Sequence, residues 1–366
     1  MFKIVVMNLG STSSKLAYWE DEVCLLKENL EHPTGEIGRF GAILDQYQYR
    51  FDKINDFLLK KGIDYKDADA VVSRGGHTRP LVGGIYRINE RMLAEIKSGQ
   101  FGRHACDIGV LVAYQMAREG RAVPMVVDPP VTDEFEPLAR YSGLPELPRR
   151  SSFHALNHRA CGKQHARKNS LDYTKLNLIV VHMGGGITVA AHRQGRMIDA
   201  TNGIEGDGPF STNRTGALPV GALVDMCYSG EYSQKEMHQK LNGNGGMMAY
   251  LGESDMRLVR ERGFKGDRRY MECFDAMMYQ VCKEIGAMAA VLKGRVDAVL
   301  LTGGMAHSGY VQISIAEAVG FIAPVVAYPG EFEMEALARG ALAGLAGQEE
   351  IKELEDHPGN SVKGLL

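Results

Sequence analysis

The sequence predicts an α/β protein built from two similar halves, and three observations carry this prediction. A hairpin around a glycine-containing turn occurs twice, in "KIVVMNLGSTSSKLAYW" and in "LNLIVVHMGGGITVAAH". A buried strand ending in two glycines also occurs twice, in "ADAVVSRGG" and in "VDAVLLTGG". A third pair of strands, in "VPMVVDPP" and "APVVAYPG", is followed by proline. Because these landmarks recur in the same order, a duplication is favoured over chance similarity between strand ends.

The elements of the first half follow from local patterns. The run Lys3–Asn8 and the alternating run "KLAYW" are expected to pair as strands around the Gly/Ser turn. Apolar residues then recur at three- to four-residue steps from Ile37 to Leu58, which is typical of an amphipathic helix. The buried strand Ala70–Ser73 and the strand within 123–130 complete this half.

The second half repeats this plan. The strand Leu178–Val181 leads into "HMGGG", "ITVAAH" returns, and Tyr270–Leu292 has the pattern of a long helix. We place one domain at 1–150, completed by a C-terminal helix at about 336–366, and the second at 151–335. Two such domains facing each other would line a cleft with their strand-end turns, where ligands bind in open α/β sheets.

Composition excludes several classes of protein. The chain has 366 residues, 45% hydrophobic and 24% charged, with a net charge of -3 and both signs scattered. This argues against a nucleic-acid partner, and no apolar run reaches the roughly 18 residues that would span a bilayer. The start "MFKIVVMNLG" is too quickly polar for a signal peptide, so we expect a cytoplasmic protein without a membrane partner. The six cysteines form no C-x-x-C and are expected to be reduced and mostly buried, with a catalytic cysteine as a minor alternative.

The two predicted turns are candidate anion sites. In "NLGSTSSK", successive backbone N–H groups, hydroxyl side chains and Lys15 could hold a phosphate, whereas "GGG" at 184–186 offers only backbone. Either turn alone would be read as an ordinary hairpin, but the pair favours a nucleotide phosphate chain. The chain contains no G-x-x-x-x-G-K-[ST], which excludes a Walker-type loop, and no G-x-G-x-x-G after a strand.

Long motifs give the chain a specific resemblance. Duplicated domains with phosphate-binding hairpins resemble the actin, hexokinase and Hsp70 superfamily. Within it, the chain resembles the acetate and butyrate kinase family, its butyrate branch most closely. The motifs that carry this resemblance are "VVSRGG", "VVDPPVTDEFEPLARYSGLPE", "RRSSFHALNHRA", "HMGGGITVAAHR", "EGDGPF" and "FIAPVVAYPGE". The resemblance implies duplicated actin-like ATPase (ribonuclease H-like) domains facing a central cleft. It also implies reversible phosphoryl transfer between ATP and butyrate or a related short or branched acid, giving an acyl phosphate and ADP.

The resemblance assigns the catalytic groups residue by residue. Arg74 and Arg214 would bind the carboxylate and the transferring phosphoryl group, since arginine offers a fixed fork of donors to such oxygens. His154 would donate a hydrogen bond to that phosphoryl group, and His182 would belong to the phosphate loop. Zinc bound by His154 and His158, four residues apart, is the rival interpretation, but the chain has no H-E-x-x-H.

Acidic residues are the candidates for Mg²⁺. Asp128 follows a predicted strand, and the resemblance implies that it holds the ion or its waters. Mg²⁺ needs few carboxylates, since waters and phosphate oxygens supply the other ligands. A second acidic ligand is expected in "GEFEMEAL". We select Glu333, with Glu331 and Glu335 as alternatives; a favourable interaction of these charges with a helix N-terminus is the simpler explanation.

The remaining candidates concern the nucleotide. "GESDMR" resembles the adenosine motif of the family and supplies Ser254, Asp255 and Arg257, while Gly303 and Gly304 would let the purine lie against backbone. The phosphates are expected to meet Asn8, Ser11, Ser13 and Lys15 on one side and Gly184, Gly185 and Gly186 on the other. Phe153 would form a wall of the acid pocket by resemblance.

Three alternatives remain open at this point. A sugar or polyol kinase of the same superfold would use Asp128 as a base, an acetate or propionate kinase would differ only in its acid, and an ATP-driven switch would need a further binding domain. The expected partners are a short-chain carboxylic acid and a nucleotide, ATP or ADP with Mg²⁺. We also expect a homo-oligomer, a dimer or larger.

Overall fold

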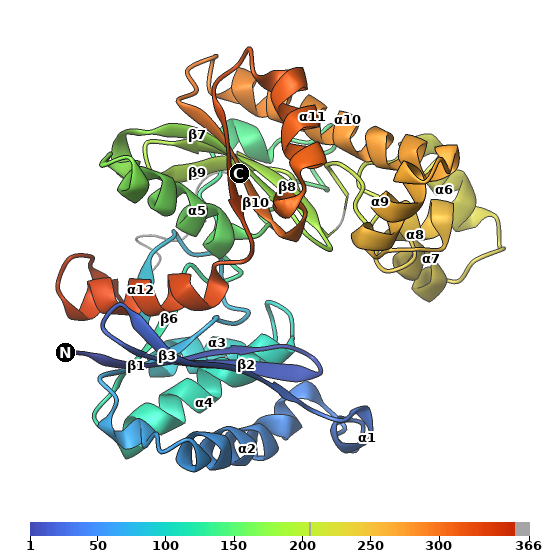
Figure 1. Ribbon diagram of the computed structural model, residues 1–366. Coiled ribbons are helices and arrows are strands. Elements are labelled where there is room, and N and C mark those ends of the chain that lie inside the picture. The colour runs from blue at the N-terminus through green and yellow to red at the C-terminus, as the bar shows by residue number, and fades with distance from the viewer. Residues whose placement is uncertain (205, 356–366) are drawn as a thin grey trace. The chain divides into compact units, whose positions relative to one another are not determined.

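A computed structural model describes residues 1–204 and 206–355, which form two compact units (Figure 1). Unit 1 comprises residues 1–133 together with the described residues from 332 onward, and unit 2 comprises 134–331. The segment 134–150, which the sequence placed in the first domain, groups with unit 2. Its contacts explain this, because Glu134 Oε2 accepts from the Met197 backbone N–H at 2.8 Å and Arg149 Nη1 donates to Asp199 Oδ1 at 2.9 Å.

Unit 1 is built on a seven-stranded sheet with the order β12-β5-β6-β4-β1-β2-β3. Its central strands are almost continuously apolar and buried, as expected for a sheet covered on both faces. The strands are β1 (Lys3–Leu9), β2 (Ser13–Glu20), β3 (Val23–Glu31), β4 (Ala70–Ser73), β5 (Ile85–Arg87), β6 (Val123–Val127) and β12 (Ile351–Lys352).

Helices cover the two faces of this sheet. Helix α4 (Ala105–Glu119) packs against β1, β4 and β6 from one side, and α12 (Glu333–Leu345) packs against the same strands from the other (Figure 1). The other helices of the unit are α1 (Thr34–Ile37), α2 (Tyr47–Lys60), α3 (Glu90–Ser98) and the 3₁₀ turns η1 (Ile43–Gln46) and η2 (Tyr65–Asp67).

Two helix predictions differ from the structure. The single helix expected from Ile37 begins only at Tyr47, because the chain turns through Gly38 and Gly41 and then forms η1 before α2. The C-terminal helix expected at about 336–366 ends at Leu345 as α12, and the chain then adds the short strand β12 to the sheet edge. Residues 356–366 lie outside the described part of the chain.

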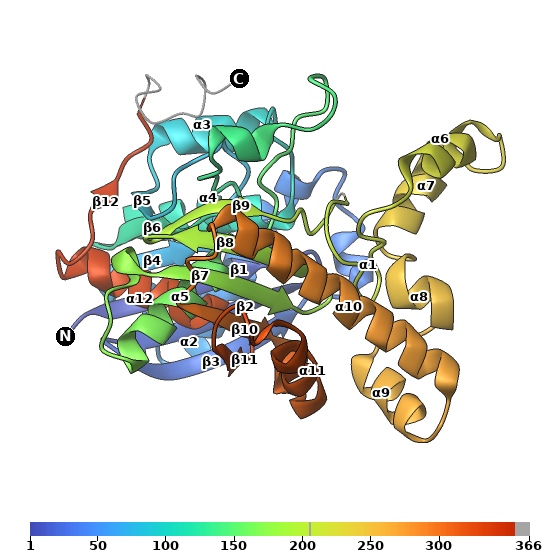
Figure 2. The same cartoon turned by 90° about the horizontal axis from the view of Figure 1, so that it is seen from above.

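Unit 2 is built on a five-stranded sheet with the order β11-β10-β7-β8-β9. Helix α5 packs against β7 and β10, and the long helix α10, predicted from its periodicity, packs against β7, β8 and β9 (Figure 2). The strands are β7 (Asn177–Met183), β8 (Ile187–Arg193), β9 (Arg196–Ala200), β10 (Ala298–Gly303) and β11 (Val325–Pro329). The helices are α5 (Ala155–Lys168), α6 (Val220–Tyr228), α7 (Gln234–Leu241), α8 (Gly246–Leu251), α9 (Met256–Phe264), α10 (Arg268–Val291), α11 (Gly309–Val319), η3 (Pro137–Arg140), η4 (Tyr173–Lys175) and η5 (Gly304–His307).

The two sheets share one topology, which confirms the predicted duplication. The order β6-β4-β1-β2-β3 in unit 1 matches β11-β10-β7-β8-β9 in unit 2. In both, the first two strands of the half pair antiparallel, and the next strands add in parallel on the other side. Strands β5 and β12 are additions at the edge of the first sheet.

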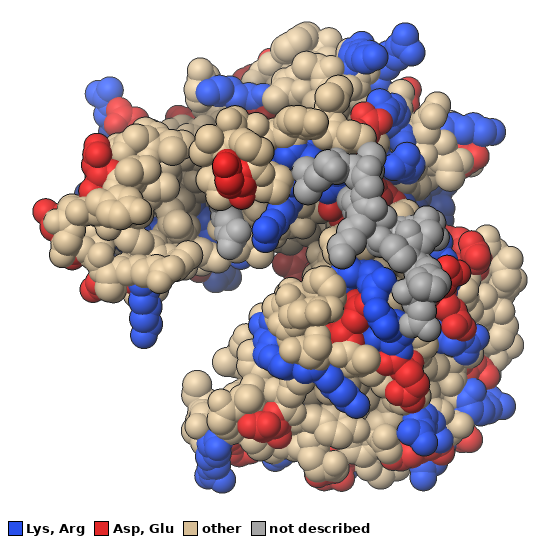
Figure 3. All heavy atoms as spheres, turned by 180° about the vertical axis from the view of Figure 1, so that it is seen from behind, with Lys and Arg blue, Asp and Glu red and all other residues tan. Residues whose placement is uncertain are grey.

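Surface charge and hydropathy agree with the composition. Lys and Arg side chains and Asp and Glu side chains are both scattered over the face drawn in Figure 3, and the described residues of that face form no stripe of Lys and Arg alone. Among the described residues, no helix combines the length and the apolar character that crossing a bilayer requires.

Candidate active site

The first predicted phosphate turn is held from beneath by a buried arginine. Arg50, on α2, is fully buried, and its guanidinium donates to the carbonyls of Ser11 at 2.7 Å, Gly10 at 3.1 Å and Ser13 at 3.2 Å. Gln46 Oε1 accepts from the same group at 3.0 Å. Burial lowers the pKa of Arg50. The carbonyls of the turn are thereby satisfied inward, while the Ser11 side chain stays exposed.

Arg50 is a residue that the sequence interpretation missed, although a signal was present. It lies three residues after Tyr47 and four before Ile54, so it occupies the apolar face of the predicted helix. A charge on such a face is costly unless it is paired, which marks the position for a specific role.

Five of the predicted residues of unit 1 lie at one end of the sheet. Asn8 Nδ2 donates to Glu333 Oε2 at 2.8 Å, and Arg74 Nε lies 3.6 Å from Glu333 Oε1. Arg74 Nη1 also donates to the backbone carbonyl of Asp128 at 3.4 Å. Lys15 is the register partner of Asn8 across the β1–β2 hairpin, so both side chains leave the same face of the sheet.

Asp128 adopts a backbone conformation that is unusual for an aspartate. Its φ is 40°, in the left-handed region, and the Gly84 backbone N–H donates to its Oδ1 at 2.8 Å while its own N–H donates to the Gly84 carbonyl at 2.9 Å. A strained backbone of this kind costs about 1–3 kcal/mol and clusters at functional sites.

The acidic segment at the start of α12 separates into different roles. Glu333 is the first residue of the helix and contacts Asn8 and Arg74 as described above. Glu335 instead accepts from Arg339 Nε at 2.7 Å. Of these two carboxylates, Glu333 is therefore the one beside Arg74.

The second predicted turn, between β7 and β8, contacts the loop of the same unit that contains Ser211 and Arg214. Ser211 Oγ donates to the Gly185 carbonyl at 2.7 Å, and Arg214 Nη1 donates to the Gly203 carbonyl at 2.5 Å. A Cβ on Gly186 would lie 2.2 Å from Arg214 Nη1 and 3.3 Å from His154 Cε1, whereas a Cβ on Gly185 would meet nothing within 4 Å. Gly186 thus allows Arg214 and His154 to approach the turn.

Arg214 carries an unpaired donor. Its Nε is buried and has no hydrogen-bond partner among the described residues, and burial lowers the pKa of its guanidinium. Buried donors are almost always satisfied, so a water or an anionic ligand would be the partner of this Nε.

Histidines and a threonine form a network below this turn. The rings of His154 and His182 stack with centroids 3.9 Å apart, and Asn157 Nδ2 lies 2.5 Å from His182 Nδ1. Thr188 Oγ1, on β8, lies 2.9 Å from His154 Nδ1 and 2.8 Å from His158 Nε2. His154 and His158 thus share one threonine hydroxyl. This arrangement favours a role in hydrogen bonding over the rival interpretation that both rings bind zinc. The sequence interpretation missed Thr188 and Asn157, because neither residue type stands out locally.

The predicted purine segment adjoins the same turn. Gly303 has φ 88°, and a Cβ there would lie 2.4 Å from the Met183 carbonyl, so this glycine lets β10 pass close to the start of the turn. A Cβ on Gly304 would meet nothing within 4 Å. Arg260 Nη1 donates to Ser308 Oγ at 3.3 Å, which connects α9, the helix that begins within "ESDMR", to the residue that follows η5.

The remaining predicted residues have local roles that the structure defines. Asp255 caps α9 by accepting from the Arg257 backbone N–H at 2.9 Å, and Arg257 Nη2 donates to its Oδ2 at 2.7 Å. Ser254 directly precedes this cap. Phe153, expected as a pocket wall, is half-buried and lies 6.3 Å from Phe135 and 5.3 Å from His158, ring centroid to ring centroid.

Comparison with known proteins identifies the family. The model of the Acetokinase family matches residues 144–322. Butyrate kinase 2 of Clostridium acetobutylicum is 46% identical over 351 residues, which cover 96% of this chain and 99% of that protein. This chain belongs to the acetate and butyrate kinase family. Butyrate kinase 1 of the same organism is 42% identical over 353 residues, again 96% of this chain and 99% of that protein.

Solved structures of the family confirm the fold. Acetate kinase from Porphyromonas gingivalis superposes with a TM-score of 0.77 at 19% identity, covering 94% of this chain and 100% of that chain. A propionate kinase from Francisella tularensis gives a TM-score of 0.70 at 20% identity, covering 93% and 99%. The duplicated actin-like ATPase fold is thereby confirmed. The chain is a short-chain fatty-acid kinase, and its family uses ATP and ADP.

Proposed function

We propose that this kinase transfers a phosphoryl group reversibly between ATP and butyrate, or an acid of similar size, giving an acyl phosphate and ADP. The observation that carries the proposal is the group at the β7–β8 turn, where Arg214 with its unpaired Nε and His154 adjoin a glycine turn. Overall identity of 46% to a butyrate kinase favours butyrate over acetate or propionate.

The chemistry explains why cations matter more than a base. A short carboxylic acid is already ionised at neutral pH, so the enzyme need not remove a proton from it. The obstacle is repulsion between the carboxylate and the phosphates, and phosphoryl transfer is mostly positioning plus electrostatic stabilisation. In this proposal Arg74 and Arg214 each supply positive charge.

The hydrogen-bond network of unit 2 supports a role for His154 in this proposal. Burial and the nearby histidines hold the pKa of His158 well below its usual value, so His158 is neutral. Its buried Nδ1 has no partner among the described residues, and an unpaired acceptor costs less than an unpaired N–H. His158 Nε2 therefore donates to Thr188 Oγ1, and the Thr188 hydroxyl donates to His154 Nδ1. With Nδ1 accepting this hydrogen bond, the proton of the His154 ring lies on Nε2, which can donate to a phosphoryl oxygen.

The residues of unit 1 fit a magnesium ion. Mg²⁺ takes oxygen ligands and is usually held by one or two carboxylates together with phosphates. Asp128, strained at φ 40°, and Glu333, beside Arg74, would hold the ion in our proposal. When bound, Mg²⁺ would neutralise phosphate charge. Asn8 would position Glu333 through its hydrogen bond of 2.8 Å.

The nucleotide and the physiological setting complete the proposal. The backbone of Gly184, Gly185 and Gly186 and the His182 side chain would bind its β- and γ-phosphates, with Ser11, Ser13 and Lys15 near the phosphoryl group in transfer. Ser254, Asp255 and Arg257 would bind the adenosine, with Gly303 and Gly304 against the purine. We further propose a cytoplasmic enzyme that assembles as a homo-oligomer.

The test is a trapping assay across substrates. The enzyme is incubated with ATP, Mg²⁺ and hydroxylamine together with acetate, propionate, butyrate, isobutyrate or valerate, while ADP release is followed with glucose and glycerol. We expect the rate of hydroxamate formation to be highest with butyrate. It should fall about fourfold for each methylene removed from the acid, since each buried methylene contributes about 0.8 kcal/mol. A preference for acetate would reassign the acid, and ADP release with polyols but no hydroxamate would overturn the proposal.

Arginine variants connect this activity to the site. Arg214→Ala and Arg74→Ala should each lose on the order of 2–4 kcal/mol of transition-state stabilisation, the usual loss for one such donor. Arg268→Ala, at a side chain 89% exposed on α10, is the matched control and should turn over normally. Near-normal turnover of Arg214→Ala would remove this arginine from the mechanism.

A further inference from the structure

A second cluster of ligand-type side chains lies in unit 1. His77 lies in the loop that follows β4, and His104, Cys106 and Asp107 surround the N-terminus of α4. The ligand atoms of His77, Cys106 and Asp107 all lie within 4.8 Å of one another. We propose that these three residues bind one transition-metal ion, with zinc preferred, and that His104 or a water completes the tetrahedron.

The distances suit such an ion. His77 Nδ1 lies 3.1 Å from Asp107 Oδ1, and Cys106 Sγ lies 4.0 Å from the same oxygen. Zinc bonds of about 2.0–2.3 Å in tetrahedral geometry separate ligand atoms by roughly 3.3–3.8 Å, so small side-chain adjustments close the site. The ring of His104 lies 6.3 Å from that of His77, centroid to centroid, within reach of the fourth position.

Asp107 is fixed in advance for this role. It is fully buried, its Oδ2 accepts from the His104 backbone N–H at 2.8 Å, and its Oδ1 accepts from the His77 backbone N–H at 2.7 Å. Backbone donors of this kind orient a ligating carboxylate without competing for the metal. A Cβ on Gly76 would lie 2.6 Å from Asp107 Oδ1, so this glycine lets the His77 loop approach α4.

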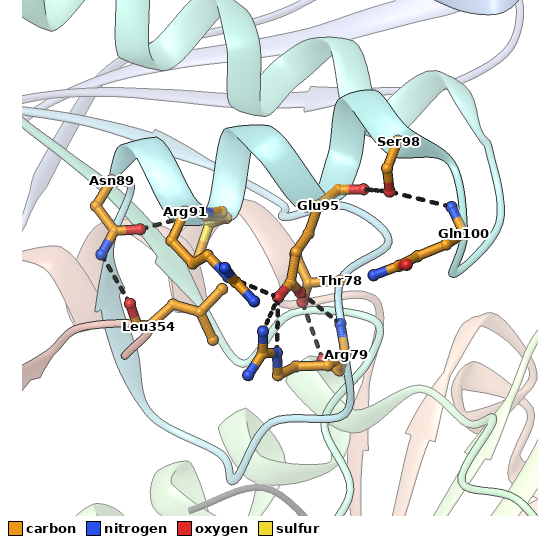
Figure 4. Close-up of polar contacts among 9 residues, drawn as sticks. Thr78, Arg79, Asn89, Arg91, Glu95, Ser98, Gln100 and Leu354 are labelled. Atoms are coloured by element: carbon orange, nitrogen blue, oxygen red, sulfur yellow. Dashed lines mark hydrogen bonds and ion pairs between the residues drawn. The ribbon is translucent and has the colours of Figure 1, made fainter. Parts of the chain in front are cut away.

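The chain on the other side of His77 is fixed as well. Arg79 donates to the buried carboxylate of Glu95 on α3 through its backbone N–H at 3.0 Å and its Nε at 2.7 Å (Figure 4). Arg91 donates to the same carboxylate from one turn away at 3.3 Å. The loop is thus anchored two residues after His77, which limits the movement available to the imidazole.

Helix capping accounts for only part of this cluster. Asp107 and His104 form a capping box at the start of α4, and that role needs no thiol and no second imidazole. Capping leaves unexplained why Cys106 and His77 converge on the same carboxylate oxygen. Thiolate, imidazole and carboxylate together select zinc or another late transition metal over magnesium, which prefers oxygen alone. The site is therefore distinct from the proposed magnesium ligands.

The metal would act as a clamp on the loop that starts at Arg74. Residues 74–77 join the end of β4 to His77. Gly75 has φ 96°, and a Cβ added to it would lie 2.6 Å from Pro129 Cβ, so this glycine lets the loop pass close to Pro129. Joining His77 to α4 would restrict this loop. The metal-binding proposal rests on the cluster alone and does not depend on the role proposed for Arg74.

Cobalt is the probe for this site, because Co²⁺ replaces zinc and reports thiolate ligation by absorbance. The full chain, stripped with a chelator and reduced, is titrated with Co²⁺ in the presence of excess Mg²⁺. We expect saturation at one Co²⁺ per chain with a thiolate-to-cobalt charge-transfer band, and loss of the band when one equivalent of Zn²⁺ is added.

Cysteine variants locate the signal. Cys106→Ser should abolish the charge-transfer band, while Cys227→Ser, at an exposed cysteine, should retain it. His77→Gln keeps the thiol and should weaken Co²⁺ binding at least 10-fold, and it serves as the test if Cys106→Ser does not fold. Near-ultraviolet circular dichroism verifies that each variant is folded. A band that survives Cys106→Ser, equal affinity of His77→Gln and the parent, or no saturable Co²⁺ binding would overturn the proposal.

Discussion

The turn between β1 and β2 and the turn between β7 and β8 occupy equivalent places in the two sheets, yet opposite kinds of contact hold them. In unit 1, Arg50 lies under the turn and satisfies its carbonyls from the buried side. In unit 2, Ser211 and Arg214 contact the turn from a loop, and Arg214 keeps a buried donor without a partner. Each half contains an arginine at its turn. Of these two arginines, Arg214 is the one with an N–H group that a ligand could accept from.

This difference predicts that the support of the first turn serves stability, whereas the support of the second turn also serves the reaction. Hydroxyl side chains of the first turn can contact a ligand because Arg50 holds the backbone in place. The second turn has no side chains, so its backbone can approach phosphates closely, and its support comes from residues that also belong to the proposed reaction. We therefore expect changes at the first turn to affect folding most, and changes at the second to affect turnover most.

Removing Arg50 should give the largest effect. Arg50→Met leaves the inward carbonyls of Gly10, Ser11 and Ser13 without their donor, and one unsatisfied buried group costs about 1–3 kcal/mol. We expect a loss of about 3 kcal/mol or more in the free energy of unfolding of unit 1, measured by chemical denaturation. Arg121→Met, at a side chain 65% exposed, is the control and should change stability by less than about 1 kcal/mol. Equal losses in both variants would contradict the proposed support.

Two neighbouring glycines test the second turn. Gly186→Ala places a methyl group against Arg214, and misplacing a catalytic group by about 1 Å can lower turnover about 100-fold. We expect kcat to fall about 10- to 100-fold in this variant. Gly185→Ala meets no atom within 4 Å, so it should fold normally and raise KM for ATP while kcat changes little. The same kinetic change in both variants would refute the distinction between these positions.

The buried histidines give unit 2 a specific acid sensitivity. Burial lowers the pKa of His192 to about 3, whereas the unfolded chain titrates near 6.5. The unfolded state therefore binds more protons between these values, and stability falls as pH falls from about 6.5 toward 3, by up to about 1.4 kcal/mol per pH unit. Denaturation at pH 7.5 and 5.5 should show this loss, and His192→Gln should reduce it. His238→Gln, at an exposed histidine, should leave the pH slope unchanged.

The smallest effect should come from the Ser11 side chain. Arg50 binds the Ser11 carbonyl, and the hydroxyl is exposed, so Ser11→Ala should change unfolding free energy by less than about 0.5 kcal/mol. Turnover should fall nevertheless if the hydroxyl meets the phosphoryl group as we propose. Thermal denaturation and kcat measured on the same preparation separate these effects. A stability loss as large as that of Arg50→Met would show that the side chain supports the turn.

The sequence predicted the repeated sheets well because their information is local. Apolar runs, glycines after strands and proline landmarks all lie within short windows, and the structure confirms their order. The predicted start of α2 was wrong, because the apolar spacing continues through residues 37–46, where Gly38 and Gly41 interrupt the helix. Contacts such as Asn8 with Glu333, 325 residues apart, depend on tertiary packing that no local pattern encodes.

The candidate site shows the same division. Motifs identified Arg74, Asp128, His154 and Arg214 as positions, and their roles remain predictions. Their partners were not visible from sequence. Thr188 connects two histidines only because the fold brings this residue of β8 to the start of α5, and the His77 cluster forms only because the β4 loop meets α4. Sequence thus predicted which residue types carry chemistry, while packing determined what each one contacts.

The position of α12 has a consequence for biosynthesis. Residues 134–331 form unit 2 from one continuous stretch, but unit 1 takes Met334, Leu337 and Ala341 of α12 to cover β1, β4 and β6. On the ribosome, roughly 200 residues separate the end of the first segment from this helix, which at about 5–20 residues per second is a delay of about 10–40 s. During that interval one face of the first sheet has no cover, so we expect nascent chains to recruit chaperones there until the last helix emerges.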